Sequence, residues 1–346
     1  MGEGAGNMAY KEQWVEWRRA SEIFSGDQYS LFGETGISVR DVNQGWIGNC
    51  WFMSSASALA EVPGRIERMF LNTDNKVNEH GIYGVNFYTL GIKHTVLVDD
   101  YIPTDSDYSY PQTLFAHLGD DNSIWSLILE KAFAKYHGNY EHIVGGWPVV
   151  ATRTLSGAPF DTMWHTEHTT DEIWDELQRT DHIDDIIQMG TPGSSDQNAN
   201  EDGLANNHAY TVIGVTTLSN EQRLVKLRNP WGSEDYHGAW SDDSENWTEE
   251  LKEEVGLEQT KSDGIFFMSI EDYHEQVEET YFNKEVSTWH SAHFLMLDDN
   301  TQSNNPGDDT WWCGTDCTKH IVTVKSDANQ GVYITTHTWD DRCMAD

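Results

Sequence analysis

The sequence predicts an α+β protein with two lobes, a helical first lobe and an antiparallel β second lobe, followed by a short β-rich segment. Two apolar stretches in the first half have helical spacing, and the second half alternates short apolar runs with polar turns. The length of 346 residues suits about two domains. Hydrophobic residues make up 38% and charged residues 23%, as in globular proteins. We expect two core domains, over 1–155 and 156–284, followed by the short β-rich segment over 285–346.

The first lobe is predicted to hold two main helices. The segment NCWFMSSASALAEV (49–62) is apolar and rich in small residues, with Asn49 as a candidate N-cap. The segment SIWSLILEKAFAKYHG (123–138) has apolar residues at helical spacing. Between them, GIYGVNFYTLGIKHTVLVDDYIP (81–103) alternates with a period of two, which predicts strands. Glycine-rich stretches then indicate a domain seam near residue 155.

The second lobe is predicted to be built on strands. NHAYTVIGV (207–215) and RLVKLRNPW (223–231) have the composition of two strands joined by a polar turn near Ser219 and Asn220. GIFFMSI (264–270) has the composition of a further strand. A hairpin of this kind brings the first residue of one strand close to the last residue of the next.

The charge of the chain excludes one class of partner. There are 58 acidic residues against 21 basic ones, a net charge of -37. A phosphate backbone would be repelled, so we expect no nucleic-acid binding. The same field favours cations, including divalent metals. Most of these carboxylates are explained by solubility alone.

The N-terminus and the cysteine content favour a reducing compartment. No apolar run is long enough for a membrane span, and no basic segment precedes an apolar one at the N-terminus. Four cysteines, Cys50, Cys313, Cys317 and Cys343, are too few for a disulfide scaffold. We therefore expect a cytoplasmic protein. Cys313 and Cys317 have the spacing of a disulfide or half a metal site, but no second pair accompanies them.

The segment QGWIGNCWFMSSA places Cys50 at a predicted helix start, where free N–H groups favour a thiolate. A nucleophilic cysteine also needs a histidine to exchange the proton and a third group to orient the imidazole. His208 and Asn229 lie at the same open end of the predicted hairpin and supply both. Each residue alone is weak evidence, since free cysteines are often buried hydrophobes.

Two more residues complete the candidate constellation. Gln44 lies six residues before Cys50, across a glycine-containing loop, and can return its amide to the oxyanion beside the Cys50 N–H. Trp231 follows Asn229 and Pro230 and can cover the bond between histidine and asparagine. These residue types together favour acyl transfer on a peptide carbonyl.

Several motifs resemble the calpain family of cysteine proteases in order and spacing. They are QGWIGNCWF, HTVLVDDYIPT, IWSLILEKAFAKYHGNYEHIVGG, NHAYTVIGV, RNPWG with GAWSDDSENW, and SDGIFFMSIEDY, and together they cover about residues 30–285. The resemblance implies a papain-like cysteine endopeptidase with two core domains. By position, Cys50 matches the nucleophile, His208 the base, Asn229 the orienting amide, Gln44 the oxyanion donor and Trp231 the indole between the domains.

The resemblance also implies one Ca²⁺ in each core domain, and binding aligns the two halves of the active site in this family. In the first domain, Gly36, Asp41 and the carbonyl of Glu34 match ligand positions. Ser123 stands where the family has a glutamate, so one anionic oxygen is missing. The alternative is that these are ordinary loop residues.

The second calcium position is better preserved in the sequence. Asp235, Asp242 and Asp263 match carboxylate ligands, and the carbonyl of Lys261 matches a backbone ligand. Ile265 replaces another glutamate of the family, so weakened affinity is expected here too. No organic cofactor is implied.

The C-terminal segment over 285–346 resembles at most the start of the family's β-sandwich module, truncated or minimal. DDNTQSNNPGDD (298–309) lacks the turn glycine and the closing glutamate of an EF-hand loop. The small subunit and extra domains of other family members are left open. Asn49 replaces the acidic residue that the family usually has beside the nucleophile.

The resulting interpretation is a cytoplasmic, calcium-dependent cysteine endopeptidase that cleaves exposed flexible segments of proteins. Three alternatives were weighed. A catalytically silent, calcium-dependent binding protein would need misaligned lobes. A carbohydrate-active enzyme would suit 15 Trp and 14 Tyr, but no carboxylate pair stands out. Zinc at His165 and His168 lacks the accompanying ligands of a zinc motif.

Overall fold

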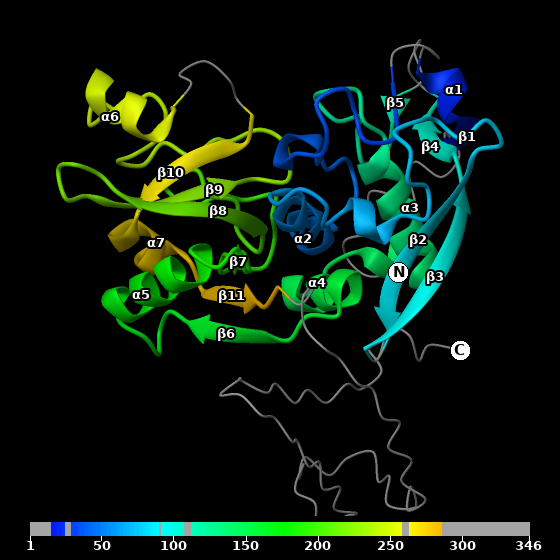
Figure 1. Ribbon diagram of the computed structural model, residues 1–346. Coiled ribbons are helices and arrows are strands. Elements are labelled where there is room, and N and C mark those ends of the chain that lie inside the picture. Colours follow the sequence, from blue (N-terminus) through cyan, green and yellow to red (C-terminus); the bar gives the residue numbers. More distant parts are fainter. Residues whose placement is uncertain (1–14, 25–28, 90, 107–111, 258–262, 286–346) are drawn as a thin grey trace, which may run out of the picture.

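Helix α2, Cys50–Ala60, lies between two lobes (Figure 1). The computed structural model describes residues 15–24, 29–89, 91–106, 112–257 and 263–285. The proposed calcium ligand Lys261, the cysteines Cys313 and Cys317, and the predicted C-terminal module from residue 286 onward lie outside the described residues.

The first lobe contains the mostly buried helix α3, Trp125–Tyr136, together with short helices and two small antiparallel sheets. One sheet has the order β1-β4-β5, and the other is the hairpin β2-β3. The strands are β1 Val15–Arg19, β2 Ile82–Thr89, β3 Ile92–Asp99, β4 Tyr101–Asp105 and β5 Gln112–Thr113. The other helices are α1 Ala20–Ile23, η3 Val39–Asp41, η4 Glu67–Met69, η5 Tyr140–Ile143 and α4 Pro148–Ser156.

The second lobe is a six-stranded antiparallel sheet with helices beside it (Figure 1). Its strand order is β10-β9-β8-β7-β11-β6. The strands are β6 Phe160–Trp164, β7 Ile186–Gly190, β8 Ala209–Thr217, β9 Arg223–Arg228, β10 Ile265–Ser269 and β11 Glu279–Asn283. The helices are α5 Thr170–Asp181, α6 Glu249–Val255 and α7 Ile270–Gln276.

The predicted α+β class is confirmed, and so are the main predicted elements. The expected helices over 49–62 and 123–138 are α2 and α3, and the expected hairpin of the second lobe is β8-β9. Asn49 occupies the N-cap position, but its side chain makes no capping bond because it is used elsewhere. The first lobe holds more strand than a helical lobe implies, since β1 pairs with the distant strand β4.

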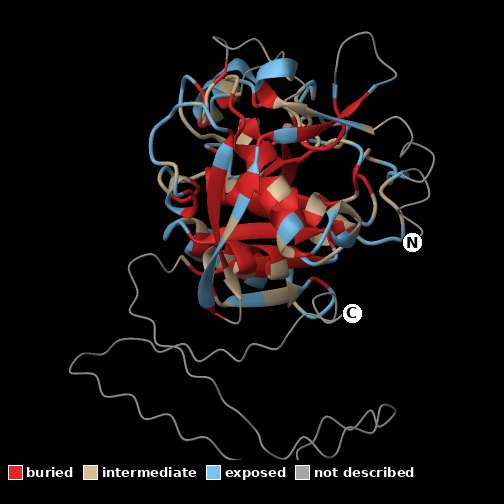
Figure 2. Cartoon of the chain, turned by 90° about the vertical axis from the view of Figure 1, so that its right-hand side faces the viewer, coloured by how far each residue is buried: buried red, intermediate tan, exposed pale blue. Residues whose placement is uncertain are grey.

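Each lobe has a core of its own, and every residue of α2 after Cys50 is buried. Figure 2 shows buried residues gathered toward the middle of the molecule. In the first lobe, the rings of Phe52 on α2 and Phe133 on α3 stack at 4.2 Å between centroids. Trp51 donates its indole N–H to the carbonyl of Ile143 at 2.9 Å. This packing holds the first turn of α2 in place, because aromatic burial contributes most of the local stabilisation.

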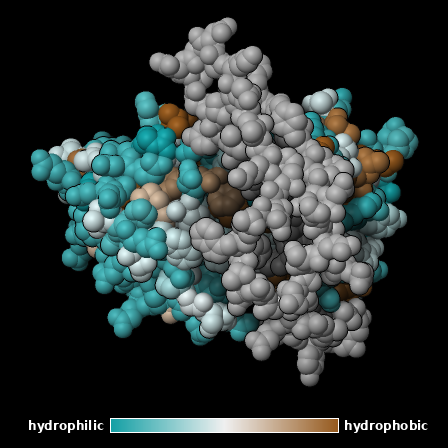
Figure 3. Space-filling model, turned by 90° about the horizontal axis from the view of Figure 1, so that it is seen from below, coloured by the Kyte–Doolittle hydropathy of each residue, from teal (hydrophilic) through white to brown (hydrophobic). Residues whose placement is uncertain are grey.

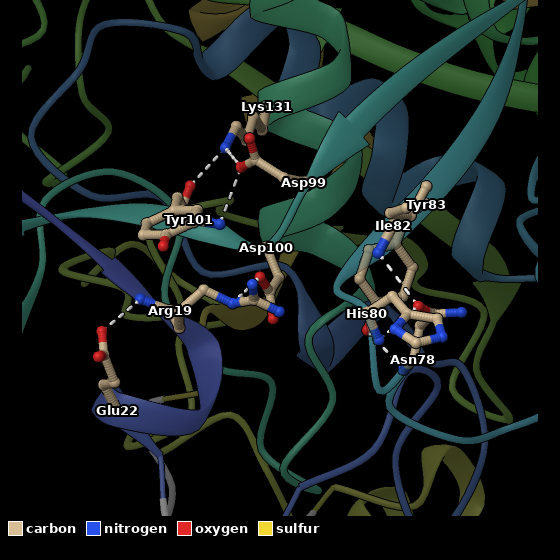
Figure 4. Close-up of polar contacts among 10 residues, drawn as sticks. All are labelled: Arg19, Glu22, Asn78, His80, Ile82, Tyr83, Asp99, Asp100, Tyr101 and Lys131. Carbon is tan, nitrogen blue, oxygen red and sulfur yellow. Dashed lines mark hydrogen bonds and ion pairs between the residues drawn. The ribbon is translucent and has the colours of Figure 1, made fainter.

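Polar contacts join the N-terminal strand to the first lobe (Figure 4). Arg19, at the end of β1, pairs with the buried carboxylate of Asp100 at 2.6 Å. Lys131 on α3 bonds the Asp99 carboxylate and the carbonyl of Tyr101, so the β3-β4 corner is tied to the helix. The buried Asp100 carboxylate needs a cation or N–H donors, and the Arg19 guanidinium supplies both.

The surface of the described chain is mostly hydrophilic on the face seen in Figure 3. This agrees with the net charge of -37. None of the described helices has the length and apolar character that crossing a membrane requires.

A buried polar network joins the two lobes behind α2. Gln188 on β7 donates to Ser55 Oγ on α2 at 2.6 Å and accepts from Thr152 Oγ1 on α4 at 2.9 Å. Asn283 on β11 donates to the same Gln188 oxygen at 3.1 Å. All four side chains are buried, and the bonds satisfy both the amide N–H and the amide oxygen of Gln188.

We predict that Gln188→Leu lowers the free energy of unfolding by about 1–3 kcal/mol, because it removes three buried hydrogen bonds at the contact between the lobes. Urea unfolding followed by tryptophan fluorescence measures this change. Gln178→Leu on the exposed face of α5 is the matched control and should change stability by less than about 0.5 kcal/mol. Equal effects of the two substitutions would show that the network does not stabilise the contact between lobes.

Candidate active site

Cys50 is the first residue of α2 and is partly exposed. The carbonyl of Asn49 accepts from the N–H groups of Phe52 and Met53 at 2.9 and 3.0 Å, which starts the helix there. Burial of the sulfur raises the pKa of the Cys50 thiol to about 11, although the backbone amides of Ala209, Trp51 and Cys50 itself act in the opposite direction. In this arrangement the thiol is therefore neutral at physiological pH.

His208 precedes β8 and Asn229 follows β9, as the predicted hairpin requires. His208 Nε2 bonds Asn229 Oδ1 at 2.9 Å. The same oxygen accepts from the backbone N–H of Trp231 at 3.1 Å, so Asn229 presents its oxygen and the imidazole donates from Nε2. His208 Nδ1 is buried and makes no hydrogen bond within the described residues, which leaves it as the basic nitrogen of a neutral ring.

Packing and backbone bonds hold the imidazole on both sides. The ring of Trp231 lies 4.4 Å from that of His208, and the ring of Tyr210 lies 4.9 Å away, edge to face. The N–H of His208 donates to Thr191 Oγ1 at 3.0 Å. Burial lowers the pKa of His208 to about 4, and the bond to Asn229 offsets part of this effect. The histidine is therefore neutral near pH 7.

The two halves of this site come from different lobes, and direct contacts hold them together. Thr211 on β8 donates its hydroxyl to the carbonyl of Ser54 on α2 at 2.9 Å. The N–H of Gln44 donates to the carbonyl of Pro230 at 2.8 Å. The backbone of Ala209, next to His208, lies close enough to affect the Cys50 thiol. The structure thus brings Cys50 and His208 to the same contact between lobes.

Gln44 lies beside this contact, but its amide is already used. The side chain is buried, and Nε2 donates to the carbonyl of Ile47 at 2.7 Å. Oε1 has no partner, and Nε2 makes no second bond to a described residue. One amide N–H is therefore left for an oxyanion while the other holds the loop.

The first predicted calcium position forms a loop cluster in which donors already occupy the carboxylate. Asp41 accepts from the N–H of Ser38 at 2.8 Å and from the indole N–H of Trp125 at 3.1 Å. Burial raises the pKa of Asp41 to about 6. Gly36 lies on the same loop in the left-handed region. Ser123 adds only a buried hydroxyl, which has no partner.

The loop also contains a carboxylate that the sequence did not single out. Asp121 accepts from the N–H and hydroxyl of Thr35 at 3.0 and 2.9 Å, and its carbonyl accepts from the N–H of Glu34 at 3.3 Å. Its second oxygen, Oδ1, is buried without a partner. With Asp41 fully bonded and the family glutamate replaced, this cluster fits a calcium ion poorly.

At the second position the structure gathers Asp242 and Asp263 with Glu234. Asp235 is exposed, and its neighbour Glu234 is the less exposed of the two and interacts with Asp242 and Asp263. Burial raises the pKa of Glu234 to about 7 and that of Asp242 to about 6, and the neighbouring carboxylates add to both shifts. Asp242 Oδ1 is buried and has no hydrogen-bond partner among the residues that the structure describes.

Arg40 of the first lobe reaches this second cluster. It donates to Asp263 Oδ2 from Nε at 2.9 Å and from Nη2 at 2.8 Å. No three carboxylate, imidazole or thiol side chains of the described chain converge closely enough to hold a metal as they stand. The orphaned Asp242 oxygen and the mutual repulsion among the acids nevertheless fit a divalent cation by charge.

The two histidines weighed for zinc lie elsewhere in the fold. His165 is buried in the second lobe, where Nε2 bonds Thr280 Oγ1 at 2.8 Å and the ring stacks on His274. His168 offers its carbonyl to His274 Nε2 at 2.9 Å. Burial lowers the pKa of His165 to about 4, which suits a neutral core histidine.

Sequence reasoning missed two residues that hold the site. Thr191 follows β7 and fixes the backbone of His208, but a lone threonine after a strand carries no signal. Glu130 on α3 is buried and bonds the side chain of Asn49, next to Cys50. A signal existed for Glu130, since a charged residue inside the apolar run SLILEKAFA is unusual.

Comparison with known proteins agrees with this geometry. Residues 5–283 match the calpain family cysteine protease. The chain is 33% identical over 269 residues to the calpain-type cysteine protease ADL1 of Oryza sativa subsp. japonica, covering 75% of this chain and 12% of that protein.

Other relatives give the same result. Identity is 30% over 297 residues to calpain-5 of Caenorhabditis elegans, covering 75% of this chain and 45% of that protein. Identity is 27% over 343 residues to calpain-8 of Rattus norvegicus, covering 92% of this chain and 47% of that protein. The chain thus spans about half or less of the length of these relatives. It belongs to the calpain family of cysteine proteases.

Proposed function

We propose that this chain is a cysteine endopeptidase in which Cys50 is the nucleophile, His208 the acid and base, and Asn229 the residue that orients the imidazole. The observation that carries the proposal is the bond from His208 Nε2 to Asn229 Oδ1 at 2.9 Å, which leaves Nδ1 without a hydrogen bond among the described residues. This tautomer has its basic nitrogen free to take a proton from a thiol.

The proposed reaction is acyl transfer. His208 Nδ1 takes the Cys50 proton, and the sulfur attacks the peptide carbonyl carbon. The N–H of Cys50 and the free N–H of Gln44 stabilise the resulting oxyanion. The imidazolium gives its proton to the leaving amine, which yields a thioester. Water then attacks the thioester as His208 takes its proton, and the acid product leaves as the proton returns to sulfur.

Trp231 has a supporting role in this proposal. Its ring packs on His208, and its N–H holds the Asn229 oxygen that orients the imidazole. An apolar cover on this bond reduces competition from water and strengthens the bond.

The electrostatics favour a resting state in which both partners are neutral. Burial raises the thiol pKa to about 11 and lowers the imidazole pKa to about 4. A thiolate–imidazolium pair would be disfavoured until the two groups come into direct contact. We infer that a small movement of one lobe against the other is needed before the proton transfers.

We propose that Ca²⁺ supplies this control, chiefly at the second cluster. Glu234, Asp242 and Asp263 are the residues that would hold it, and the carbonyl of Lys261 is a further candidate by position. When bound, the cation would neutralise carboxylates that repel one another. Asp263 already bonds Arg40 across the lobes, so a change at this cluster reaches the first lobe directly.

Substrate and compartment remain proposals of the same kind. The relatives are named as calpains and calpain-type cysteine proteases, and we propose proteins with exposed flexible segments as substrates. We propose a reducing compartment such as the cytoplasm, because the nucleophile must stay a free thiol. A catalytically silent, calcium-dependent binding protein is the second candidate, favoured by the absence of a bond from His208 Nδ1 to the thiol.

We predict that Cys50→Ala and His208→Ala each reduce hydrolysis of an unstructured protein such as casein by at least about a thousandfold. The assay uses reducing buffer with and without calcium, and circular dichroism checks the fold. His94→Ala, at an exposed position on β3, is the matched control and should keep wild-type activity. Full activity in Cys50→Ala would exclude the proposed mechanism.

We predict that Asp242→Asn weakens calcium binding at least about tenfold, because it removes an anionic ligand. Asp74→Asn, at an exposed position, should bind as the wild type does. Isothermal titration calorimetry measures both. Binding should also weaken as the pH falls below about 7 and then 6, since Glu234 and Asp242 take up protons there. An Asp242→Asn titration identical to the wild type would dismiss this cluster as the site.

A further inference from the structure

A buried carboxylate outside the candidate site is bonded to the residue before Cys50. Glu130 on α3 is 2% exposed. One oxygen accepts from Asn49 Nδ2 at 2.8 Å, and the other accepts from the backbone N–H of Ala116 at 3.0 Å. No described Lys, Arg or His forms an ion pair with it. A carboxylate in such a place depends on these two donors for its stability.

The bond to Asn49 connects Glu130 to the proposed oxyanion donor. The N–H of Asn49 donates to the carbonyl of Ile47 at 2.8 Å. The side chain of Gln44 donates to the same carbonyl at 2.7 Å. A short chain of hydrogen bonds therefore runs from Glu130 through Asn49 and Ile47 to Gln44.

The bond to Ala116 holds the opposite side of the same loop. The N–H of Trp46 donates to the carbonyl of Leu114 at 2.9 Å, and the N–H of His117 donates to the carbonyl of Asn43 at 2.8 Å. The segment 113–117 thus lies along the segment 43–49. Glu130 accepts one hydrogen bond from each of them, so a single side chain fixes both.

We propose that Glu130 is a positioning residue, which sets the Gln44 amide and the first turn of α2 by holding Asn49 and Ala116 together. The proposal deepens the function proposed above and rests on it for its kinetic test. Gln44 acts on the oxyanion only if its second N–H lies within a few tenths of an ångström of the required place. The chain of bonds from Glu130 supplies that placement.

Titratable groups lie on each element around Glu130. They are Cys50 on α2, His117 on the segment 113–117, and Tyr140, Glu141 and His142 on η5. His117 bonds Thr113 Oγ1 at 2.7 Å through Nδ1. Burial raises the pKa of Tyr140 well above its usual value, and the charge of Glu130 adds to this effect. On α3 itself, Lys131 turns toward Asp99, so no cation stabilises the Glu130 carboxylate.

The test compares the single variant Glu130→Gln with a double variant that combines Asn49→Asp and Glu130→Gln. In this double variant, called the reversed pair, the donor and the acceptor are exchanged. Glutamine keeps only one of the two acceptor oxygens, so the Asn49 amide and the Ala116 N–H can no longer both donate to residue 130. We expect kcat for peptide hydrolysis to fall about tenfold to a hundredfold with KM within twofold. The reversed pair restores one donor and one acceptor, so it should regain most of the lost kcat. Glu253→Gln on the exposed face of α6 is the matched control.

A second measurement separates positioning from damage to the fold. Alkylation of Cys50 by iodoacetamide forms no oxyanion, so its rate in Glu130→Gln should stay within about threefold of the wild type. Wild-type kcat in Glu130→Gln, or no recovery in the reversed pair, would overturn the proposal. Alkylation that falls as far as hydrolysis would also overturn it, because the effect would then be general.

A third measurement keeps this inference independent of the proposed function. Burial raises the pKa of Glu130 to about 7. The side-chain amide of Asn49, followed by NMR, should therefore titrate near neutral pH in the wild type and not in Glu130→Gln. A wild type without any hydrolysis would overturn the proposed function alone. An Asn49 amide signal that is identical in the wild type and in Glu130→Gln at every pH would overturn the bond on which the positioning role depends.

Discussion

The contact between α2 and β8 is the constraint on which the rest of this structure depends. Cys50 begins α2 in the first lobe, and His208 immediately precedes β8 in the second, so the site exists only where these elements meet. The hydroxyl of Thr211 and the buried network around Gln188 hold the two elements together. Because buried polar groups are stable only when paired, these bonds also specify how the lobes are aligned.

The same constraint explains the electrostatics of the site. Packing α2 against β8 buries His208 and leaves Cys50 only partly exposed with its sulfur desolvated, and this favours the neutral forms of both. In the proposed mechanism, reactivity then depends on a small change at the contact between the lobes. Arg40 of the first lobe pairs with Asp263 in the acidic cluster of the second lobe. The proposed cation at this cluster would act through that pair.

Local patterns allowed much of this to be predicted. The α2 and α3 helices follow from apolar spacing, and the bond from His208 to Asn229 follows from a hairpin with a polar turn. Non-local features were not accessible from the sequence, such as the pairing of β1 with β4. Glu234 replaces Asp235 in the acidic cluster because the turn after β9 decides which of two adjacent carboxylates points inward. The roles of the site residues stay predictions.

The pH dependence of Cys50 alkylation tests the central claim, a buried neutral thiol, most directly. The measurement uses protein with Cys313, Cys317 and Cys343 changed to Ser, with Cys50→Ala as the blank. In chelator we predict that the iodoacetamide rate rises only toward pH 11, and that calcium moves this rise to lower pH. A fast rate at pH 6 in chelator, unchanged by calcium, would contradict it, because the thiolate would already be formed at rest.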